Sequence, residues 1–185
     1  MEQTDPESDR KGYTLVYTGE GKGKTTAAIG LAVRAAGQGY KVLILQFIKS
    51  SGRICGEHIA LQKLGVDIRP LGAGFTWTGS PEIHRTALKE AWMTARDEVM
   101  GGAWDVIVLD EINNALAISR FPVDDVLPLA GVLELITNKP SHVHLVLTGR
   151  EARPEVMDAA DLVTLMQPLK HYYAEGVPAI RGIEF

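Results

Sequence analysis

The sequence predicts an α/β fold in which an open, mostly parallel sheet is flanked by helices on both faces. Short runs rich in Val, Ile and Leu alternate along the chain with longer amphipathic stretches. The short runs are almost continuously apolar, which is typical of strands covered on both faces. They are bounded by Gly, Asp or Pro, which favour turns. Regular alternation of strand and helix is the pattern of a parallel α/β sheet.

Six apolar runs are expected to be strands buried on both faces: residues 13–18, 41–46, 66–70, 106–110, 144–148 and 162–166. Three of the intervening stretches are expected to be helices: residues 25–37, 81–100 and 123–138. The second helix has a capping residue, Ser80, followed by Pro81, and glycines follow it. Such residues favour helix starts and stops.

Length and composition place the chain among ordinary globular proteins. Its 185 residues, 45% hydrophobic and 23% charged, predict one domain over residues 12–185 after a polar, disordered arm, residues 1–11. The net charge of -4 argues against broad binding to nucleic acid or anionic membranes. The sequence contains neither a signal peptide nor an apolar run long enough to cross a bilayer, which predicts a cytoplasmic protein. The single cysteine, Cys55, excludes an internal disulfide and is expected to be a buried thiol.

A glycine-rich segment, residues 18–26 (TGEGKGKTT), joins the first predicted strand to the first predicted helix. It matches the P-loop pattern G-x-x-x-x-G-K-[ST] except at its first position, where Thr18 replaces Gly. Such a loop turns backbone N–H groups toward phosphate oxygens at a helix N-terminus, whereas a plain surface turn would not open a helix. The sequence therefore predicts a P-loop NTPase-like fold. The expected nucleotide-binding residues are Gly19, Glu20, Gly21, Lys22, Gly23, Lys24, Thr25 and Thr26.

Two adjacent carboxylates, Asp110 and Glu111, end the fourth predicted strand. In P-loop proteins an acidic residue at this position orients Mg²⁺ beside the phosphate loop, where the Thr25 hydroxyl is a second ligand. The alternative is an acidic pair that only stabilises a helix N-terminus. We expect Thr25, Asp110 and Glu111 to form a site for Mg²⁺ or Mn²⁺, and the sequence leaves open which carboxylate contacts the ion.

Other polar and aromatic residues follow predicted strands and are therefore expected at the carboxyl edge of the sheet, where ligands bind. Residues 46–49 (QFIK) follow the second strand, and Arg150 follows the fifth. Arg150 can reach phosphate or ribose, or can form a surface ion pair. Phe75 and Trp77 lie in a glycine-rich loop. This pair is either a binding surface or a small hydrophobic cluster, and residue physics alone does not decide between the two.

The chain contains seven motifs in this order: TGEGKGKTTAA, VLILQFIK, GAGFTW, VIVLDEIN, LVLTGR, ADLVTLM and GIEF. Together they resemble the ATP:corrinoid adenosyltransferases of bacterial cobalamin synthesis and salvage. The resemblance that they carry extends over residues 13–185. Thr18 at the first loop position is the form that this family has. The resemblance implies that a cob(I)alamin or precursor corrinoid attacks the 5′-carbon of ATP, and that triphosphate leaves intact.

The resemblance also implies roles for particular residues. Lys24 would stabilise the triphosphate. Phe75 and Trp77 would pack against the corrin and displace its lower axial ligand, so that a flavoprotein can reduce Co(II) to Co(I). Arg34 and Asn113 match family positions near the nucleotide, and a homodimer is expected.

The sequence departs from the family pattern in two places. Residues 78–80 (TGS) stand where relatives more often have Glu-Thr-Gln-Asp, and Leu165 replaces a frequent Glu. The phosphate loop is also compatible with two other functions. A conventional P-loop ATPase or kinase would release ADP or phosphate instead of triphosphate. A non-catalytic nucleotide or corrinoid carrier would bind its ligands without forming a cobalt–carbon bond.

Overall fold

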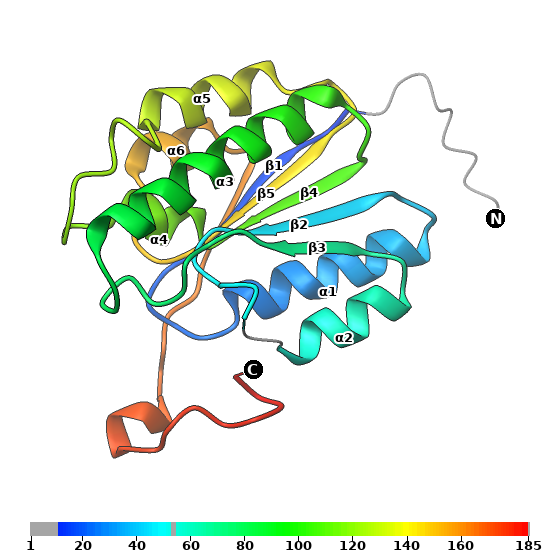
Figure 1. Ribbon diagram of the computed structural model, residues 1–185. Coiled ribbons are helices and arrows are strands. Elements are labelled where there is room, and N and C mark those ends of the chain that lie inside the picture. The colour runs from blue at the N-terminus through cyan, green and yellow to red at the C-terminus, as the bar shows by residue number, and fades with distance from the viewer. Residues whose placement is uncertain (1–10, 53–54, 185) are drawn as a thin grey trace.

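The computed structural model describes residues 11–52 and 55–184, and the arm expected at residues 1–11 lies outside them except for Lys11. Six strands form one sheet in the order β3-β2-β4-β5-β1-β6, and every neighbouring pair is parallel (Figure 1). The strands are β1 Thr14–Thr18, β2 Val42–Gln46, β3 Asp67–Pro70, β4 Val106–Asp110, β5 His144–Thr148 and β6 Leu162–Leu165. The predicted parallel α/β sheet is thus confirmed.

Helices cover both faces of the sheet (Figure 1). On one face lie α1 Lys24–Gly37 and α2 Gly56–Lys63, and on the other lie α3 Pro81–Gly101, α4 Ile112–Leu116, α5 Leu129–Asn138 and α6 Pro154–Ala159. Alternate residues of a strand point to opposite faces of the sheet and pack into two separate hydrophobic cores. In β2, Leu43 packs under α3 and α5, while Ile44 packs with Ala28 and Ala32 of α1. Continuous apolar runs are needed because both faces are covered.

The edge strands depart from the expected burial. Every residue of β2 and β4 is buried, but every residue of β6 is exposed and those of β3 are half-buried. The reason is position: β6 pairs only with β1 and β3 only with β2. The apolar character of a strand does not reveal its place in the sheet order.

The helix boundaries agree with the sequence at the two longer helices and differ at the third. The helix expected from residue 123 begins at Leu129, with Pro128 as its N-cap. Proline disfavours helical backbone in the residue before it, here Leu127, so the helix does not extend back through that residue, and residues 124–126 form a turn. Four further elements have no signal in the sequence pattern: α2, α4, α6 and the 3₁₀ turn Tyr172–Glu175. Each has eight residues or fewer.

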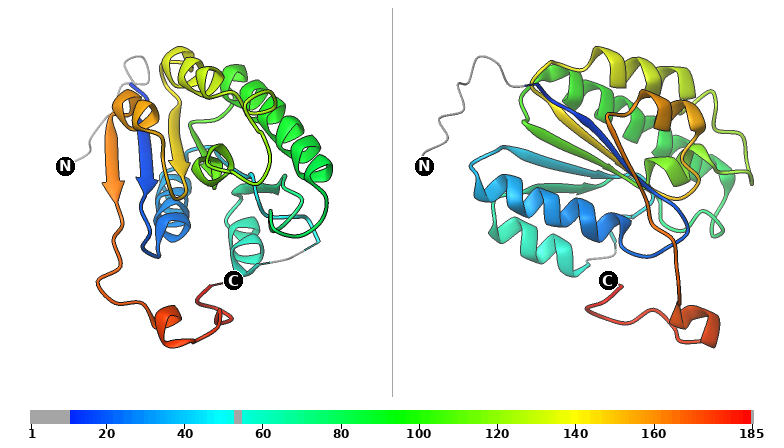
Figure 2. Two further views of the ribbon diagram at one scale, coloured as in Figure 1. Left: turned by 90° about the vertical axis from the view of Figure 1, so that its left-hand side faces the viewer. Right: turned by 180° about the vertical axis from the view of Figure 1, so that it is seen from behind.

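The segment after β6 leaves the body of the sheet and turns back toward the phosphate loop. Figures 1 and 2 show it as the orange-to-red chain extending beyond the sheet edge. Its return is fixed by Lys22, whose Nζ lies 2.6 Å from Glu184 Oε2 and donates to the Ile183 carbonyl at 3.1 Å. The segment therefore belongs to the surroundings of the loop between β1 and α1.

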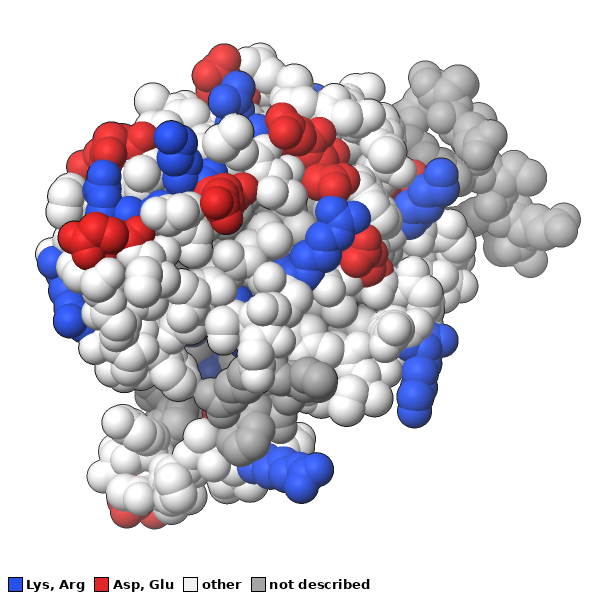
Figure 3. All heavy atoms as spheres, viewed as in Figure 1, with Lys and Arg blue, Asp and Glu red and all other residues white. Residues whose placement is uncertain are grey.

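Charged side chains of both signs are interspersed over the face drawn in Figure 3. Within the described residues, none of the helices combines the length and apolar character that crossing a bilayer demands. Cys55 is buried, at 4% exposure, as expected from the sequence.

Two glycines provide a matched test of this packing. A Cβ at Gly72, in the loop after β3, would lie 2.3 Å from the Ile48 carbonyl oxygen in the loop after β2. At Gly30, inside α1, a Cβ would meet nothing within 4 Å. We expect Gly72→Ala to lower the free energy of unfolding by about 1–3 kcal/mol through overpacking. Gly30→Ala should raise it by about 0.5–1 kcal/mol because alanine favours helix. Urea unfolding measures the change in the free energy of unfolding for each variant. A change in the same direction for both would contradict the packing described.

Candidate nucleotide site

The loop between β1 and α1 needs its glycines for two different reasons. Gly19 and Gly23 have φ of 97° and 112°, left-handed values that favour glycine. Gly21 instead packs closely: its N–H donates to the Met166 carbonyl at 2.7 Å, and a Cβ there would lie 2.8 Å from the same oxygen. The residue that follows β6 thus supports the loop from outside.

Lys24, the first residue of α1, folds back over this loop. Its Nζ donates to the carbonyls of Gly19 and Gly21, each at 2.6 Å. Burial lowers the pKa of Lys24, and the Arg150 guanidinium adds to that effect, while nearby carboxylates oppose it. The ammonium group is therefore already held at the centre of the phosphate loop.

Asp110 lies behind the loop, fully buried, and is the hydrogen-bond acceptor for three side chains. Its Oδ1 accepts from the hydroxyls of Thr25 at 2.8 Å and Thr148 at 2.7 Å, and its Oδ2 accepts from Gln46 Nε2 at 3.0 Å. The sheet produces this meeting: Gln46 is paired with Asp110 in register, and Thr148 ends the strand on the other side of β4. The carboxylate thus joins the ends of three strands and the first turn of α1.

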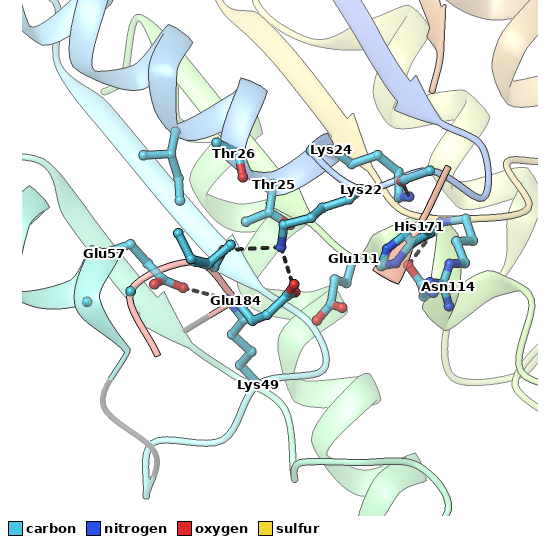
Figure 4. A pocket seen from close by; sticks show the side chains of 17 residues that line it. Lys22, Lys24, Thr25, Thr26, Lys49, Glu57, Glu111, Asn114, His171 and Glu184 are labelled. Carbon is cyan, nitrogen blue, oxygen red and sulfur yellow. Dashed lines mark hydrogen bonds and ion pairs between the residues drawn. The ribbon is translucent and has the colours of Figure 1, made fainter. Parts of the chain in front are cut away.

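Glu111 has a different environment although it is the next residue. Its φ of 63° is left-handed, and its N–H donates to the Thr148 hydroxyl at 2.9 Å. The side chain lines the cavity beside the loop (Figure 4). Burial raises the pKa of Glu111 to about 7, and the Asp110 carboxylate adds to this, while Lys49 and two other cations oppose it.

A cavity of about 510 Å³ lies in front of the phosphate loop (Figure 4). The loop and the first turns of α1 form one wall through residues 21–26 and Ile29. Glu111, Asn114 and Arg150 line it from the segments after β4 and β5, Lys49 lines it from the segment after β2, and Glu57 lines it from the first turn of α2. The cavity is therefore assembled from the carboxyl edge of the sheet.

The C-terminal segment completes the cavity, and the sequence analysis did not predict this. Its residues His171, Ile183 and Glu184 are among those that line it. Glu184 forms an ion pair with Lys22 (Figure 4), and it also accepts a hydrogen bond from the Tyr172 hydroxyl. Nothing in the composition of the GIEF ending indicates where in space it lies.

Lys49, which the sequence placed at the carboxyl edge of the sheet, lines the cavity and is paired with Glu57, a residue that no sequence motif indicated. Lys49 Nζ lies 2.5 Å from Glu57 Oε1. Burial acts to lower the pKa of Lys49, but the carboxylates of Asp110, Glu57 and Glu111 outweigh it and raise that pKa. A positive charge consequently lies inside the cavity opposite Glu111.

Arg150 forms the surface ion pair that the sequence allowed as an alternative, and it also lines the cavity. Its Nε lies 3.4 Å from Glu20 Oε2, with both side chains more than half exposed. Exposed ion pairs contribute little to stability, so this one does not hold the guanidinium away from a ligand. The Arg150 N–H donates to Asn114 Oδ1 at 3.0 Å.

The structure does not bring Arg34 or Asn113 to the cavity. Arg34 is exposed in the last turn of α1, about 15 Å along the helix axis from Lys24. Asn113 is fully buried, and neither polar atom of its side chain has a hydrogen-bond partner. Its neighbour Asn114 lines the cavity instead. The short helix α4 begins at Ile112, and its turn rotates residue 113 toward the core and residue 114 toward the site.

Phe75 and Trp77 lie in the loop between β3 and α3, outside the cavity wall. Their rings stack with centroids 4.5 Å apart and planes at 17°. They are 47% and 66% exposed, so they form a surface pair and not a buried cluster. His84 anchors the loop by donating from Nε2 to the Thr78 carbonyl at 2.5 Å.

The oxygen donors beside the phosphate loop suit Mg²⁺ that is shared with a bound phosphate. They do not suit a metal ion whose ligands all come from the protein. Among the described residues, no group of three or more His, Cys, Asp or Glu side chains could hold a metal ion. Mg²⁺ commonly takes one or two carboxylates, keeps waters and relies on substrate phosphates. The Thr25 hydroxyl oxygen and the Glu111 carboxylate are suitable oxygen donors beside the phosphate loop.

The parallel sheet, with its glycine loop at the N-terminus of α1 and its buried acidic strand end, places the chain in the P-loop NTPase-like class. Within that class it belongs to one family: residues 10–185 match the family described as ATP:corrinoid adenosyltransferase BtuR/CobO/CobP.

Individual relatives agree with the family match. The corrinoid adenosyltransferase of Escherichia coli K12 is 36% identical over 178 residues, covering 96% of this chain and 87% of that protein. The corrinoid adenosyltransferase CobA of Salmonella typhimurium has the same identity and coverage. That of Pseudomonas aeruginosa is 37% identical over 180 residues, covering 96% of this chain and 85% of its own.

The environment of Glu111 predicts how stability changes with pH. Because the folded state holds this proton more tightly than the unfolded state, stability falls as pH rises from 4.5 to about 7. We expect Glu111→Gln to lose this dependence. At pH 8 the variant should be more stable than the wild type, by at most about 3 kcal/mol, with little difference at pH 4.5.

Urea unfolding of the ligand-free protein between pH 4.5 and 8 measures the difference. Glu134→Gln, at an exposed residue of α5, is the matched control for the loss of one carboxylate. A Glu111→Gln curve parallel to that of the wild type would show that Glu111 is not the titrating group.

Proposed function

We propose that this chain transfers the 5′-deoxyadenosyl group of ATP to the Co(I) of a corrinoid and releases triphosphate. One observation carries the proposal: the family match extends over residues 10–185, and five of the motifs within it, TGEGKGKTTAA, VLILQFIK, VIVLDEIN, LVLTGR and GIEF, contribute residues to the wall of one cavity. Lys24, Thr25 and Glu111 lie on that cavity together. These are the groups that a bound polyphosphate and its metal require.

The triphosphate would lie along the phosphate loop. Lys24 is held among the loop carbonyls, and Lys22 and Arg150 line the same cavity. Cations and backbone N–H groups that are already in place stabilise the charge that develops on a leaving polyphosphate. The site can therefore stabilise triphosphate as a leaving group.

Mg²⁺ or Mn²⁺ would be held by the Thr25 hydroxyl and the Glu111 carboxylate together with phosphate oxygens. The metal supplies charge neutralisation on the triphosphate. Asp110 would not contact the metal directly, because both of its carboxylate oxygens already accept hydrogen bonds from protein side chains. It orients the Thr25 hydroxyl, whereas Glu111 faces the ligand.

In the reaction, Co(I) is the nucleophile. Its electron pair forms the bond to the 5′-carbon of ATP as the bond from that carbon to the triphosphate oxygen breaks. The electrons of the broken bond leave with triphosphate, and the cobalt becomes Co(III). Because the substrate supplies the nucleophile, no protein Ser, Cys or His has to attack.

The corrinoid would lie against Phe75 and Trp77. Their stacked, exposed rings offer a flat apolar surface of the kind that a macrocycle covers. His84 fixes the backbone of their loop at Thr78, and Arg120 donates to the Thr76 carbonyl at 3.3 Å. A flavoprotein reductant, a homodimer and a cytoplasmic location are further expectations from the resemblance.

The decisive assay is anaerobic, with Mg-ATP and chemically reduced cob(I)alamin. A light-sensitive adenosylcobalamin spectrum with stoichiometric triphosphate is the expected result. An unchanged corrinoid spectrum, with ADP and phosphate accumulating, would point to a conventional P-loop ATPase. Binding of both ligands without products would indicate a carrier.

Removal of the loop cation should slow the transfer. We expect Lys24→Ala to lose about 2–4 kcal/mol of transition-state stabilisation, which is about 30- to 1,000-fold in rate. Initial rates at saturating cob(I)alamin measure the loss. Lys89→Ala, an exposed lysine on α3, is the matched control and should keep the wild-type rate. A Lys24→Ala rate close to that of the control would contradict the role proposed for this ammonium.

The aromatic pair should matter most when cobalt still has to be reduced. We expect Trp77→Ala to slow the reaction that starts from Co(II) and a reductant by about tenfold, the size of one aromatic stacking contribution. The reaction that starts from prereduced Co(I) should be affected much less. Parallel assays from the two starting states measure the ratio, and equal losses in both would refute the displacement of the axial ligand.

A further inference from the structure

A chain of hydrogen bonds runs from the segment before α2 to the Thr25 hydroxyl. The Cys55 N–H donates to His58 Nδ1 at 2.9 Å, and His58 Nε2 lies 2.7 Å from Gln46 Oε1. Gln46 Nε2 donates to Asp110 Oδ2, and Asp110 Oδ1 accepts from Thr25. The Thr25 hydroxyl is thereby connected to a histidine on another helix.

The donors and acceptors in this chain determine its direction. Because His58 Nδ1 accepts the Cys55 N–H, the ring proton lies on Nε2 and is donated to the Gln46 carbonyl oxygen. The Gln46 amide is then oriented with its nitrogen toward Asp110. The reverse orientation would place its oxygen against the carboxylate, and two acceptors would face each other.

Burial makes this orientation consequential. Gln46 and Asp110 are both fully buried, so water cannot replace a lost partner. In such surroundings a hydrogen bond is strong when it is made and costly when it is absent. An unanchored Gln46 would leave Asp110 free to shift, and the hydroxyl of Thr25 would shift with it.

We propose that His58, acting through Gln46, is a positioning residue that holds Asp110 as the acceptor for Thr25 and so sets the affinity for the metal–nucleotide complex. The inference deepens the proposed function, because it rests on Mg-ATP being the ligand of the phosphate loop. His58 itself does not line the cavity, which distinguishes it from the groups that touch the ligand.

A purely structural role for His58 makes a different prediction. The residue is the third of α2 and closes a capping box with Cys55. That cap uses Nδ1 alone, whereas the contact with Gln46 uses Nε2. A substitution that keeps one of these bonds and loses the other can therefore separate the two roles.

Three variants accomplish this separation. His58→Gln can accept from Cys55 with its oxygen and donate to Gln46 with its nitrogen. His58→Glu can keep the cap, since Glu is a favoured third residue, but an ionised carboxylate has no proton to donate. His58→Leu loses both bonds. The matched readouts are the midpoint of thermal unfolding and the dissociation constant of Mg-ATP from titration calorimetry.

We expect His58→Gln to keep Mg-ATP affinity within about twofold, and His58→Glu and His58→Leu to weaken it by about tenfold, as for one buried hydrogen bond. His58→Leu should lower the unfolding midpoint more than His58→Glu does, because only the leucine variant also loses the cap. Wild-type affinity in His58→Leu would overturn the proposal. So would an affinity loss in His58→Gln equal to that in His58→Leu.

The charge that His58→Glu introduces is controlled with Gln46→Met, which interrupts the chain at its middle. In that background the effect of either His58 variant on Mg-ATP affinity should nearly vanish if the two residues act in series. An undiminished effect would mean that charge or the cap acts directly, and the proposal would fail.

These binding measurements need no corrinoid. A wild-type protein that binds Mg-ATP but forms no adenosylcobalamin would refute the proposed transfer and leave the role of His58 to be decided by its variants. A wild-type protein that does not bind Mg-ATP would overturn both.

Discussion

The buried carboxylate of Asp110 is the interaction on which the rest of the site depends. A carboxylate taken out of water costs several kcal/mol unless it is paired or fully hydrogen-bonded. Here Thr25, Gln46 and Thr148 compensate that cost from three segments. Each donor can reach Asp110 only if β2 and β5 lie on either side of β4 and α1 begins beside the loop. One buried group thus ties the strand order to the position of the phosphate loop.

Two adjacent carboxylates acquire different chemistry from this arrangement. Asp110 keeps strand geometry, and its side chain lies among the carboxyl ends of the neighbouring strands. Protein donors there bond to both carboxylate oxygens. The left-handed backbone of Glu111 directs the Glu111 side chain into the cavity. Few donors replace water there, so the pKa of Glu111 rises. Under the proposed function the first is a fixed acceptor and the second a ligand for the metal. The different roles of Asp110 and Glu111 therefore come from their surroundings and not from their residue types.

The cavity is closed by parts of the chain that lie far from the phosphate loop in sequence. Lys22 is paired with Glu184, and the cation at Lys49 is paired with Glu57. Under the proposed function, triphosphate must exchange with the first of these carboxylates before it can use Lys22. The C-terminal segment is thus part of the charge balance at the loop as well as part of its wall.

Periodicity and motif spacing were sufficient to predict the parallel sheet, the two longer helices, the phosphate loop and the acidic end of β4. These features are local: a glycine loop before a helix or an apolar run of five residues has the same meaning wherever it lies. The start of α5 could have been read from Pro128, because its effect on the preceding residue is also local. The short helices lack enough turns to show a period.

Only the tertiary structure decided which residues meet. Whether Asn113 or Asn114 faces the cavity depends on a rotation of about 100° between successive helical residues, set by the turn at Glu111. The exposure of β6 depends on its place at the edge, and the approach of Glu184 to Lys22 depends on a return of the chain after the sheet ends. The contact between His58 and Gln46 joins two segments through a buried side chain. Such contacts depend on long-range packing, which no local pattern of residues encodes.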